Sequence, residues 1–204
     1  MTTFFPELRE RIQHSWLVKP NLSSHRKQAL NKLKTAIEDS PDITNIVFIC
    51  THNSRRSHLA QLACFAAANW FGYDQVTTYS GGTEATAFHP NAVAAIEGAG
   101  FQVTSDGDTN PTYTIQLGPE GPASKCFSKV YDHPDNPSAN FIAVMVCSDA
   151  DENCPFVPGA RHRISLPYDD PKTADNTPEA AAIYDQRLDQ IARELFWVFD
   201  ALNK

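Results

Sequence analysis

The sequence lacks any apolar run long enough to span a membrane. Residues 1–7 also lack the basic and apolar regions of a secretory signal peptide. Lys and Arg form no cluster, and the net charge of −7 argues against a protein that binds nucleic acid. No segment repeats along the chain. We therefore expect a cytoplasmic protein whose partners include neither a membrane nor nucleic acid.

Cysteine is scarce and irregularly spaced, with only five residues, at positions 50, 64, 126, 147 and 154. An odd number at such spacing does not fit a disulfide framework, so in a reducing compartment we expect catalytic or incidental thiols. Six residues separate Cys147 from Cys154, whereas a zinc-binding pair usually has about two to four, and no His or second Cys pair completes a site. The acidic residues between them lack the full calcium-loop pattern. We expect neither a metal nor a cofactor.

What is present is a chain of 204 residues, 42% of them hydrophobic, which suits one globular domain with an appendage. Residues 1–43 are predicted to form a helical extension that packs on the main domain, in which Leu8, Ile12 and Trp16 mark one short face. Ser23 or Ser24 is placed to cap a second helix. The inner face of that helix would carry Ala29, Leu30, Leu33 and Ile37.

Apolar runs in the rest of the chain are predicted strands that alternate with helices. The runs are 46–49, 75–80, 141–147 and 161–166. Apolar residues at helical spacing follow the first two runs, and a long helix is expected from Pro178 onward. This alternation predicts a parallel α/β sheet, in which chemistry gathers at the carboxyl ends of the strands. Residues 103–140 are rich in Pro, Gly, Asp and Asn, and we expect a hairpin of 113–117 with 126–131 there.

The most informative stretch follows the first predicted strand. It comprises Cys50, Thr51, His52, Asn53, Ser54, Arg55, Arg56 and Ser57, and it leads into a helix. Such a loop turns its backbone N–H groups toward a common centre, where the helix dipole favours an anion. Arg56 adds a guanidinium that can bind an oxyanion through two N–H groups, and the positive field is expected to lower the pKa of the Cys50 thiol. Without Arg56 at this spacing, Cys50 would be an ordinary buried thiol. We therefore predict an oxyanion site made by residues 51–57, with Cys50 as the nucleophile.

Three more candidates follow the later predicted strands. Asp170 precedes a proline, which is an ordinary turn signal, but on the same sheet edge as the Cys50 loop it becomes a candidate general acid. Cys147 ends a strand and Cys154 follows it, so one thiolate could resolve an adduct on Cys50 and the other could resolve that disulfide. The alternative is a pair of incidental cysteines. A bridge needs Cα atoms within about 7 Å, so the intervening segment would have to unwind in part.

Together these residues resemble the low-molecular-weight protein tyrosine phosphatase superfamily, and especially its thioredoxin-coupled arsenate reductases. The segments that carry the resemblance are Cys50 to Ser57, Cys147 to Pro155 and Tyr168 to Pro171. The resemblance covers about residues 44–204, with an insertion at about 113–140. It implies a three-layer α/β fold, in which a four-stranded parallel sheet carries helices on both faces.

The resemblance also implies a role for each candidate. Cys50 would attack arsenate while Arg56 and the loop amides hold the oxyanion. Asp170 would assist the loss of the leaving oxygen. Cys147 would attack Cys50 and release arsenite, after which Cys154 would attack Cys147. Thioredoxin would reduce the resulting Cys147–Cys154 disulfide.

The loop both matches and departs from this family. Asn53 and Ser57 match residues that order the loop and support the thiolate. His52 stands where the family usually has glycine, with positive φ as one way to accommodate its side chain. Arg55 replaces a common cysteine and adds positive charge, and Gln61 replaces a glutamate that helps to bind potassium in some reductases. We therefore predict no potassium site.

Two other functions remain open. In a phosphomonoester hydrolase, Cys50 would form a phosphocysteine and Asp170 would act first as general acid and then as general base. Lys172 stands in place of the tyrosine beside Asp-Pro in eukaryotic-type phosphatases, which argues against a phosphotyrosine substrate. A non-catalytic oxyanion-binding module is the third possibility, because residues 1–43 and 113–140 could recruit a partner.

Overall fold

A four-stranded parallel sheet forms the centre of the molecule. The computed structural model describes residues 2–40, 43–154 and 156–202. The strands, in the spatial order β2-β1-β6-β7, are β1 (Thr44–Cys50), β2 (Val76–Gly82), β6 (Phe141–Met145) and β7 (Ala160–Ser165). The expected parallel α/β sheet is confirmed, and each strand lies close to the run that predicted it. Central β1 pairs with both neighbours, so that Cys50 lies beside Gly82 and Ile49 beside Met145.

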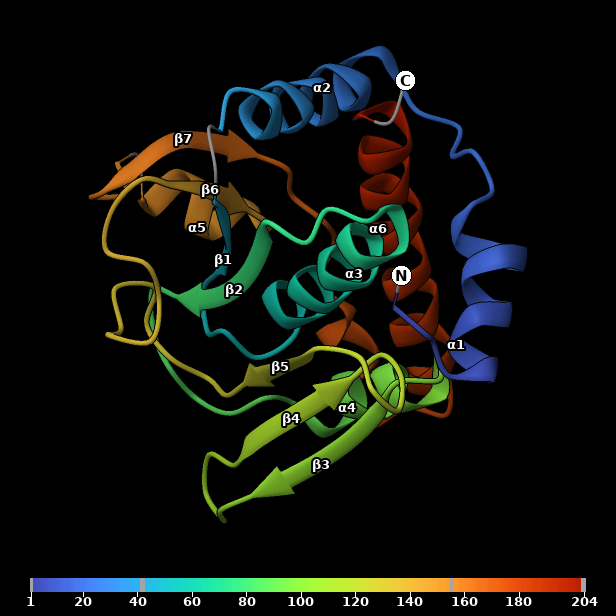
Figure 1. Cartoon of the computed structure of the whole chain (residues 1–204). Helices are drawn as coiled ribbons and strands as arrows, with labels where there is room; N and C mark the ends of the chain where they lie inside the picture. Colours follow the sequence, from blue (N-terminus) through green and yellow to red (C-terminus); the bar gives the residue numbers. More distant parts are fainter. Residues whose placement is uncertain (1, 41–42, 155, 203–204) are drawn as a thin grey trace.

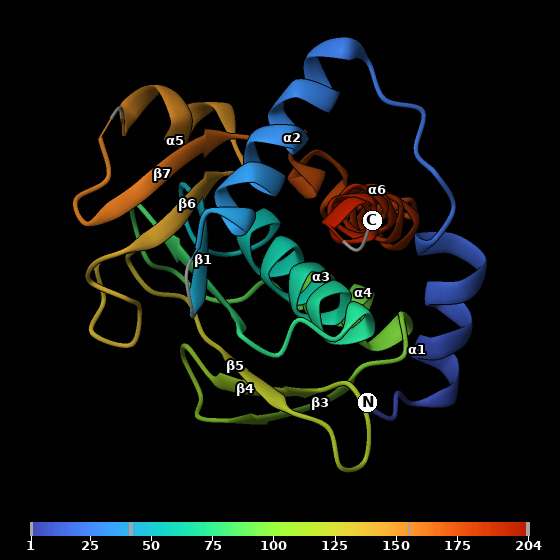
Figure 2. The ribbon, with the colours of Figure 1, turned by 45° about the horizontal axis from the view of Figure 1, so that its top comes forward.

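Helices cover both faces of this sheet, as the resemblance implied. On one face, α3 (Arg56–Phe71) packs against α6 (Ala180–Leu202), and α2 (Ser24–Glu38) lies beside α6 (Figure 1). The short α5 (Ser148–Asn153) lies on the opposite face (Figure 2). Helix α4 (Pro90–Gly98) also packs against α6. In the described part of the chain, no helix is both long enough and apolar enough to cross a membrane.

Local signals explain where these helices begin and end. Ser23 caps α2, because its side chain accepts a hydrogen bond from the Arg26 N–H at 3.2 Å. His89 caps α4 in the same way, with its ring Nδ1 accepting from the Asn91 N–H at 3.3 Å. Gly72 ends α3 at φ 77°, a left-handed conformation that glycine adopts without steric cost.

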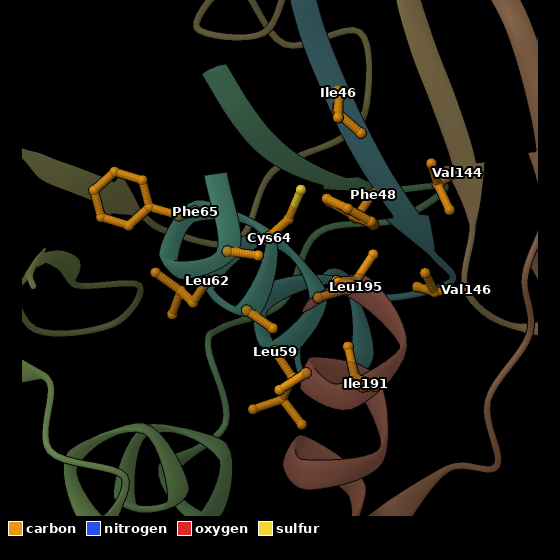
Figure 3. Packing of buried hydrophobic residues seen from close by; sticks show 14 of the residues in the cluster. Ile46, Phe48, Leu59, Leu62, Cys64, Phe65, Val144, Val146, Ile191 and Leu195 are labelled. Carbon is orange, nitrogen blue, oxygen red and sulfur yellow. The ribbon is translucent and has the colours of Figure 1, made fainter. Parts of the chain in front are cut away.

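The main core lies between the sheet and the α3–α6 pair. Side chains from β1, α3, β6 and α6 converge there, and Figure 3 shows among others Ile46, Phe48, Leu59, Leu62, Val144, Ile191 and Leu195, all of them buried. Every residue of α3 from Arg56 to Ala68 is buried. Because the helix is enclosed on nearly all sides, it fixes the position of the loop that precedes it.

The N-terminal segment shares this core. Helix α1 (Pro6–Arg11) continues into a π-helical turn, η1 (Ile12–Trp16), and their buried side chains include Leu8, Ile12 and Trp16. Asp189 of α6 accepts hydrogen bonds from Trp16 Nε1 at 2.7 Å and from Ser15 Oγ at 2.9 Å. Asp189 also pairs with Arg11, so one carboxylate joins this segment to α6.

A second, antiparallel sheet lies beside the first. Its strands are β3 (Gln102–Asp106), β4 (Thr112–Gln116) and β5 (Ala123–Cys126), in that order. The expected hairpin is present, but its second strand is 123–126, so the prediction of 126–131 was wrong, and β3 was not predicted. The backbone at 129–131 instead crosses to the parallel sheet, where Gly82 N–H donates to the Lys129 carbonyl at 2.9 Å. Gly81 permits this approach, since a Cβ there would lie 2.4 Å from Tyr131 Cα.

Candidate active site

The loop after β1 is held from outside by its carbonyl groups. Their hydrogen-bond donors are Thr83 N–H to Cys50 (3.2 Å), Glu84 N–H to Thr51 (2.8 Å), Ser128 Oγ to His52 (3.0 Å) and His89 N–H to Ser54 (2.9 Å). The N–H groups of residues 51–55 have no hydrogen-bond acceptor among the described residues. The loop carbonyls are thus occupied by hydrogen bonds, and the loop N–H groups remain available to bind a ligand. This arrangement, at the N-terminus of a helix, suits an oxyanion.

Asn53 organises the centre of this loop. It adopts φ 44°, the left-handed conformation that Asn tolerates better than most residues, so the residue at positive φ is Asn53 and not His52. Its Oδ1 accepts from the Lys129 N–H at 2.9 Å, and its Nδ2 donates to Ser57 Oγ at 2.8 Å. Ser57 Oγ lies 3.1 Å from Cys50 Sγ. A continuous hydrogen-bonded chain therefore runs from the Lys129 backbone to the Cys50 thiol.

Arg56 begins α3 and reaches toward the loop after β7. Its guanidinium donates to the Tyr168 carbonyl at 3.0 Å and to Asp170 Oδ2 at 2.6 Å. Asp170 Oδ1 accepts from the Lys172 N–H at 3.0 Å and so caps the short 3₁₀ helix η2 (Pro171–Ala174). The structure thus brings Asp170 into an ion pair with Arg56, at the edge of the sheet where the Cys50 loop lies.

The Arg55 side chain belongs to a separate network. It donates to Tyr184 Oη at 2.6 Å and to Asp175 Oδ2 at 2.5 Å. Burial, followed by the hydrogen bond to Asp175, raises the pKa of Tyr184 to about 12. Burial, followed by the charge of Arg55, lowers the pKa of His89. These contacts occupy the Arg55 guanidinium, so its backbone N–H is what Arg55 offers to the loop. This network was not predicted.

Cys147 lies beside the Cys50 loop. The pairing of β6 with β1 continues to Val146, whose N–H donates to the Ile49 carbonyl at 2.8 Å. The backbone that leads to Cys147 therefore runs beside the start of the Cys50 loop. Cys147 Sγ lies 3.5 Å from Thr51 Oγ1. Its sulfur also caps α5 by accepting from the Ala150 N–H at 3.3 Å.

Cys154 follows the last residue of α5 and is partly exposed, whereas Cys147 is fully buried. The structure therefore brings Cys147 to the nucleophile loop. All five cysteines are free thiols. Burial raises the pKa of Cys64, and it raises the pKa of Cys126 to about 12, so both are poor nucleophiles near neutral pH.

Gln61 of α3 makes hydrogen bonds to both sheets. Its Nε2 donates to the Thr78 carbonyl at 3.3 Å and to Ser124 Oγ at 3.1 Å, which ties β2 to the second sheet. Within residues 2–40, 43–154 and 156–202, no group of three His, Cys, Asp or Glu side chains is arranged to hold a metal ion. The contacts of Ser128 and Lys129 with the loop come from a segment to which the sequence assigned no chemical role.

Similar proteins of known activity include several arsenate reductases. Those of Bacillus subtilis (strain 168) and Bacillus licheniformis are each 30% identical to this chain over 151 residues, which cover 74% of this chain and 91% of theirs. An arsenate reductase of Staphylococcus epidermidis is 29% identical over 134 residues, covering 64% of this chain and 80% of its own length. No family model matches the chain.

Solved structures with a similar fold include phosphatases. A low-molecular-weight protein tyrosine phosphatase from T. tengcongensis superposes with a TM-score of 0.54 at 14% identity, covering 78% of this chain and 99% of its own. A mutant of YwlE from Bacillus subtilis gives a TM-score of 0.51 at 18% identity, covering 79% and 99%. At these identities the likeness concerns the fold alone.

Proposed function

This chain belongs to the family of the arsenate reductases and has the fold of the low-molecular-weight protein tyrosine phosphatases, and from that premise we propose that it reduces arsenate to arsenite through three of its cysteines. Cys50 is the proposed nucleophile. Cys147 and Cys154 are the proposed resolving pair. The loop amides of residues 51–57 and Arg56 are proposed to bind the oxyanion, and Asp170 to protonate the leaving oxygen.

The first stage takes place at arsenic. The Cys50 thiolate attacks arsenic(V), and one oxygen departs as water after it receives protons, with Asp170 as the nearby donor. The Cys147 thiolate then attacks the Cys50 sulfur. The sulfur–arsenic bond breaks, its electron pair stays on arsenic, and arsenite leaves. Arsenate gains two electrons, and two thiols become the Cys50–Cys147 disulfide.

The second stage moves the disulfide outward. The Cys154 thiolate attacks the Cys147 sulfur, and Cys50 departs as a thiolate that is ready for another turnover. The Cys147–Cys154 disulfide then needs two electrons from a dithiol protein, for which we propose thioredoxin. Partial exposure of Cys154 supports its place as the outermost thiol.

One observation carries this proposal: Cys147 Sγ lies 3.5 Å from Thr51 Oγ1, and Thr51 is the residue directly after Cys50. A hydrolase of this fold needs only the nucleophile, the oxyanion loop and an acid. A second thiol beside the loop has a use in reduction, because it can displace arsenic from Cys50.

Phosphomonoester hydrolysis is the second candidate, favoured by one contact. Asp170 Oδ2 lies 2.6 Å from Arg56 Nη2. A carboxyl group is therefore held near the place that the leaving oxygen would occupy in a phosphate bound by Arg56. In that reaction Cys50 forms a phosphocysteine and water then releases phosphate. Cys147 and Cys154 take no part.

Paired assays on the Cys147→Ser variant separate the two candidates. We expect its thioredoxin-coupled turnover of arsenate to fall to background, because arsenic can no longer be displaced from Cys50 by a thiol. Hydrolysis of an aryl phosphate should stay within a few-fold of wild type, since the oxyanion loop is unchanged. Cys126→Ser is the matched control, because it removes a buried thiol that already packs 3.9 Å from Ser124 Oγ, and both activities should persist.

Three outcomes would decide against the proposed thiol-relay reductase. Full arsenate turnover by Cys147→Ser would exclude the thiol relay. Aryl-phosphate hydrolysis by wild type without any arsenate reduction would select the phosphatase. Inactivity of wild type toward both substrates, together with binding of phosphate to the folded protein, would instead select a non-catalytic oxyanion-binding module.

A further inference from the structure

The ends of α5 hold the two proposed resolving cysteines apart. Cys147 is the N-cap and Cys154 the C-cap of this helix. Seven residue steps at helical rise separate their Cα atoms by about 10 Å, whereas a disulfide requires about 4.4–6.8 Å. The Cys147–Cys154 bond therefore requires α5 to unwind at one end.

Few interactions within α5 itself resist that unwinding. The helix is only six residues long, and its N-terminal cap is a sulfur atom, a weak hydrogen-bond acceptor. A helix this short has little stability of its own in water. Contacts from the rest of the protein must keep it folded.

Arg163 of β7 makes those contacts at the C-terminal end of α5. Its Nε donates to the Cys154 carbonyl at 2.9 Å, and its guanidinium donates to the Asp151 carbonyl at 2.6 Å. The same guanidinium forms an ion pair with Asp151 Oδ1 at 2.7 Å, while Ser165 Oγ donates to Asp151 Oδ2 at 2.5 Å. One arginine thus satisfies two carbonyls at the end of a helix, where backbone partners run out.

We propose that Arg163 is a positioning residue for the thiol relay: it holds α5 folded in the reduced protein and releases the Cys154 backbone when Cys154 attacks Cys147. This inference rests on the proposed function. In the step concerned, the new bond joins the Cys154 and Cys147 sulfurs, the Cys50–Cys147 bond breaks, and Cys50 keeps the electron pair as a thiolate. Arg163 exchanges neither electrons nor protons.

The reduction potential of the Cys147–Cys154 pair is the quantity that Arg163 should set. Contacts present only in the folded, reduced α5 stabilise the dithiol, so their loss favours the disulfide. Charge-assisted hydrogen bonds of this kind correspond to a shift of about 10- to 100-fold in the equilibrium constant against a reference dithiol. For a two-electron couple, that shift is about 30–60 mV toward more negative potential.

The test is a redox titration of the full-length protein, wild type and Arg163→Ala, in dithiothreitol buffers with the Cys147–Cys154 disulfide identified by peptide mass. Arg163→Ala should shift the reduction potential toward more negative values by the amount given above, and Arg163→Lys should shift it less in the same direction. Arg161→Ala is the matched control, because Arg161 lies on the same strand but donates to Ser40 and Ala36 of the N-terminal segment; its potential should equal that of wild type. If Arg163→Ala fails to fold, Ser165→Ala tests the same contact set and should also shift the potential downward.

Two results would overturn the assignment, and they are distinguishable. In a folded Arg163→Ala protein, the equilibrium constant of the Cys147–Cys154 couple against dithiothreitol could lie within about two-fold of the wild-type value. That result would exclude this role for Arg163 and leave the relay intact. Absence of any Cys147–Cys154 disulfide in oxidised wild type would remove the relay itself and the role of Arg163 with it.

Discussion

His58 follows Ser57 in the first turn of α3 and is completely buried. Its Nδ1 lies 3.1 Å from Ser80 Oγ, and its ring stacks on Phe88 with centroids 4.0 Å apart. Burial, followed by the nearby Lys129 ammonium, lowers the pKa of His58 to about 3. The imidazole is therefore neutral at pH 7, and a proton there would add a second positive charge to the core behind the anion loop.

This shift makes stability depend on pH in a definite direction. An unfolded His titrates near pH 6.5, so between about pH 6.5 and 3 the unfolded chain binds a proton that the folded chain does not. His58 therefore contributes stability above pH 6.5 that is lost as pH falls, by at most about 1.4 kcal/mol per pH unit. Urea unfolding from pH 7.5 to 4.5 measures the slope.

The comparison is with His58→Asn, which keeps an acceptor near Ser80. We expect it to be less stable than wild type at pH 7.5, because the stack on Phe88 is lost. Its stability should fall less steeply between pH 6.5 and 4.5, since no buried imidazole remains to titrate. Equal slopes in the two proteins would show that His58 does not carry this dependence.

Single residues also show how far the sequence could predict the site. Cys50 and Arg56 were predictable as candidates, because strand, loop and helix signals surround them within a few positions. The hydrogen-bond partners of Arg55 and Arg163 were not predictable, because a long side chain can reach acceptors that are distant in sequence and become close only in the folded protein. Their roles, like those of the catalytic candidates, stay predictions that the proposed experiments test.

At the scale of elements, Asp189 links the N-terminal helices to α6. One carboxylate accepts from Trp16 Nε1, Ser15 Oγ and Arg11 Nε. Asp189→Ala would leave the buried indole N–H of Trp16 without an acceptor and would free Arg11 and Ser15. We expect the free energy of unfolding to fall by about 2–3 kcal/mol. Chemical denaturation followed by tryptophan fluorescence measures the change.

Asp185→Ala is the matched control for this prediction. Asp185 lies one helical turn earlier in α6, is 44% exposed and pairs with the same Arg11. An exposed pair contributes little, so its loss should cost below about 1 kcal/mol. Similar losses in both variants would indicate that general charge on α6, and not the buried carboxylate, attaches the N-terminal segment.

The strands differ in how strongly their sequence pattern predicts them. β1 and β6 are nearly continuous apolar runs buried on both faces, so both were predictable. β3 was not, because four of its five residues are exposed and it pairs with β4 at the edge of its sheet. The short β5 was misplaced by a few residues, since its alternation extends over only four positions.

At the scale of the whole molecule, the N-terminal residues contribute to one continuous core. Leu8, Ile12, Trp16 and Phe4 are buried within the same cluster as the strands of the parallel sheet. Trp16 contacts the rings of Phe101, in the middle of the chain, and Phe196, near its C-terminus. The sequence predicted a helical extension packed on the main domain but not the side chains that receive it, because those lie more than 80 residues away.

Removal of residues 1–22 should therefore destabilise the entire protein and not merely shorten it. Four buried side chains would leave the core, each worth about 1.5–3 kcal/mol, and together they match the whole stability of a typical domain, about 5–15 kcal/mol. We expect the truncated chain to show no cooperative thermal transition. A double variant, Leu17→Ser with Val18→Ser, is the control, because both residues belong to the same segment but are 40% and 52% exposed, so its transition should stay near that of wild type. A truncated chain that melts cooperatively within a few degrees of wild type would instead mark residues 1–22 as a dispensable appendage.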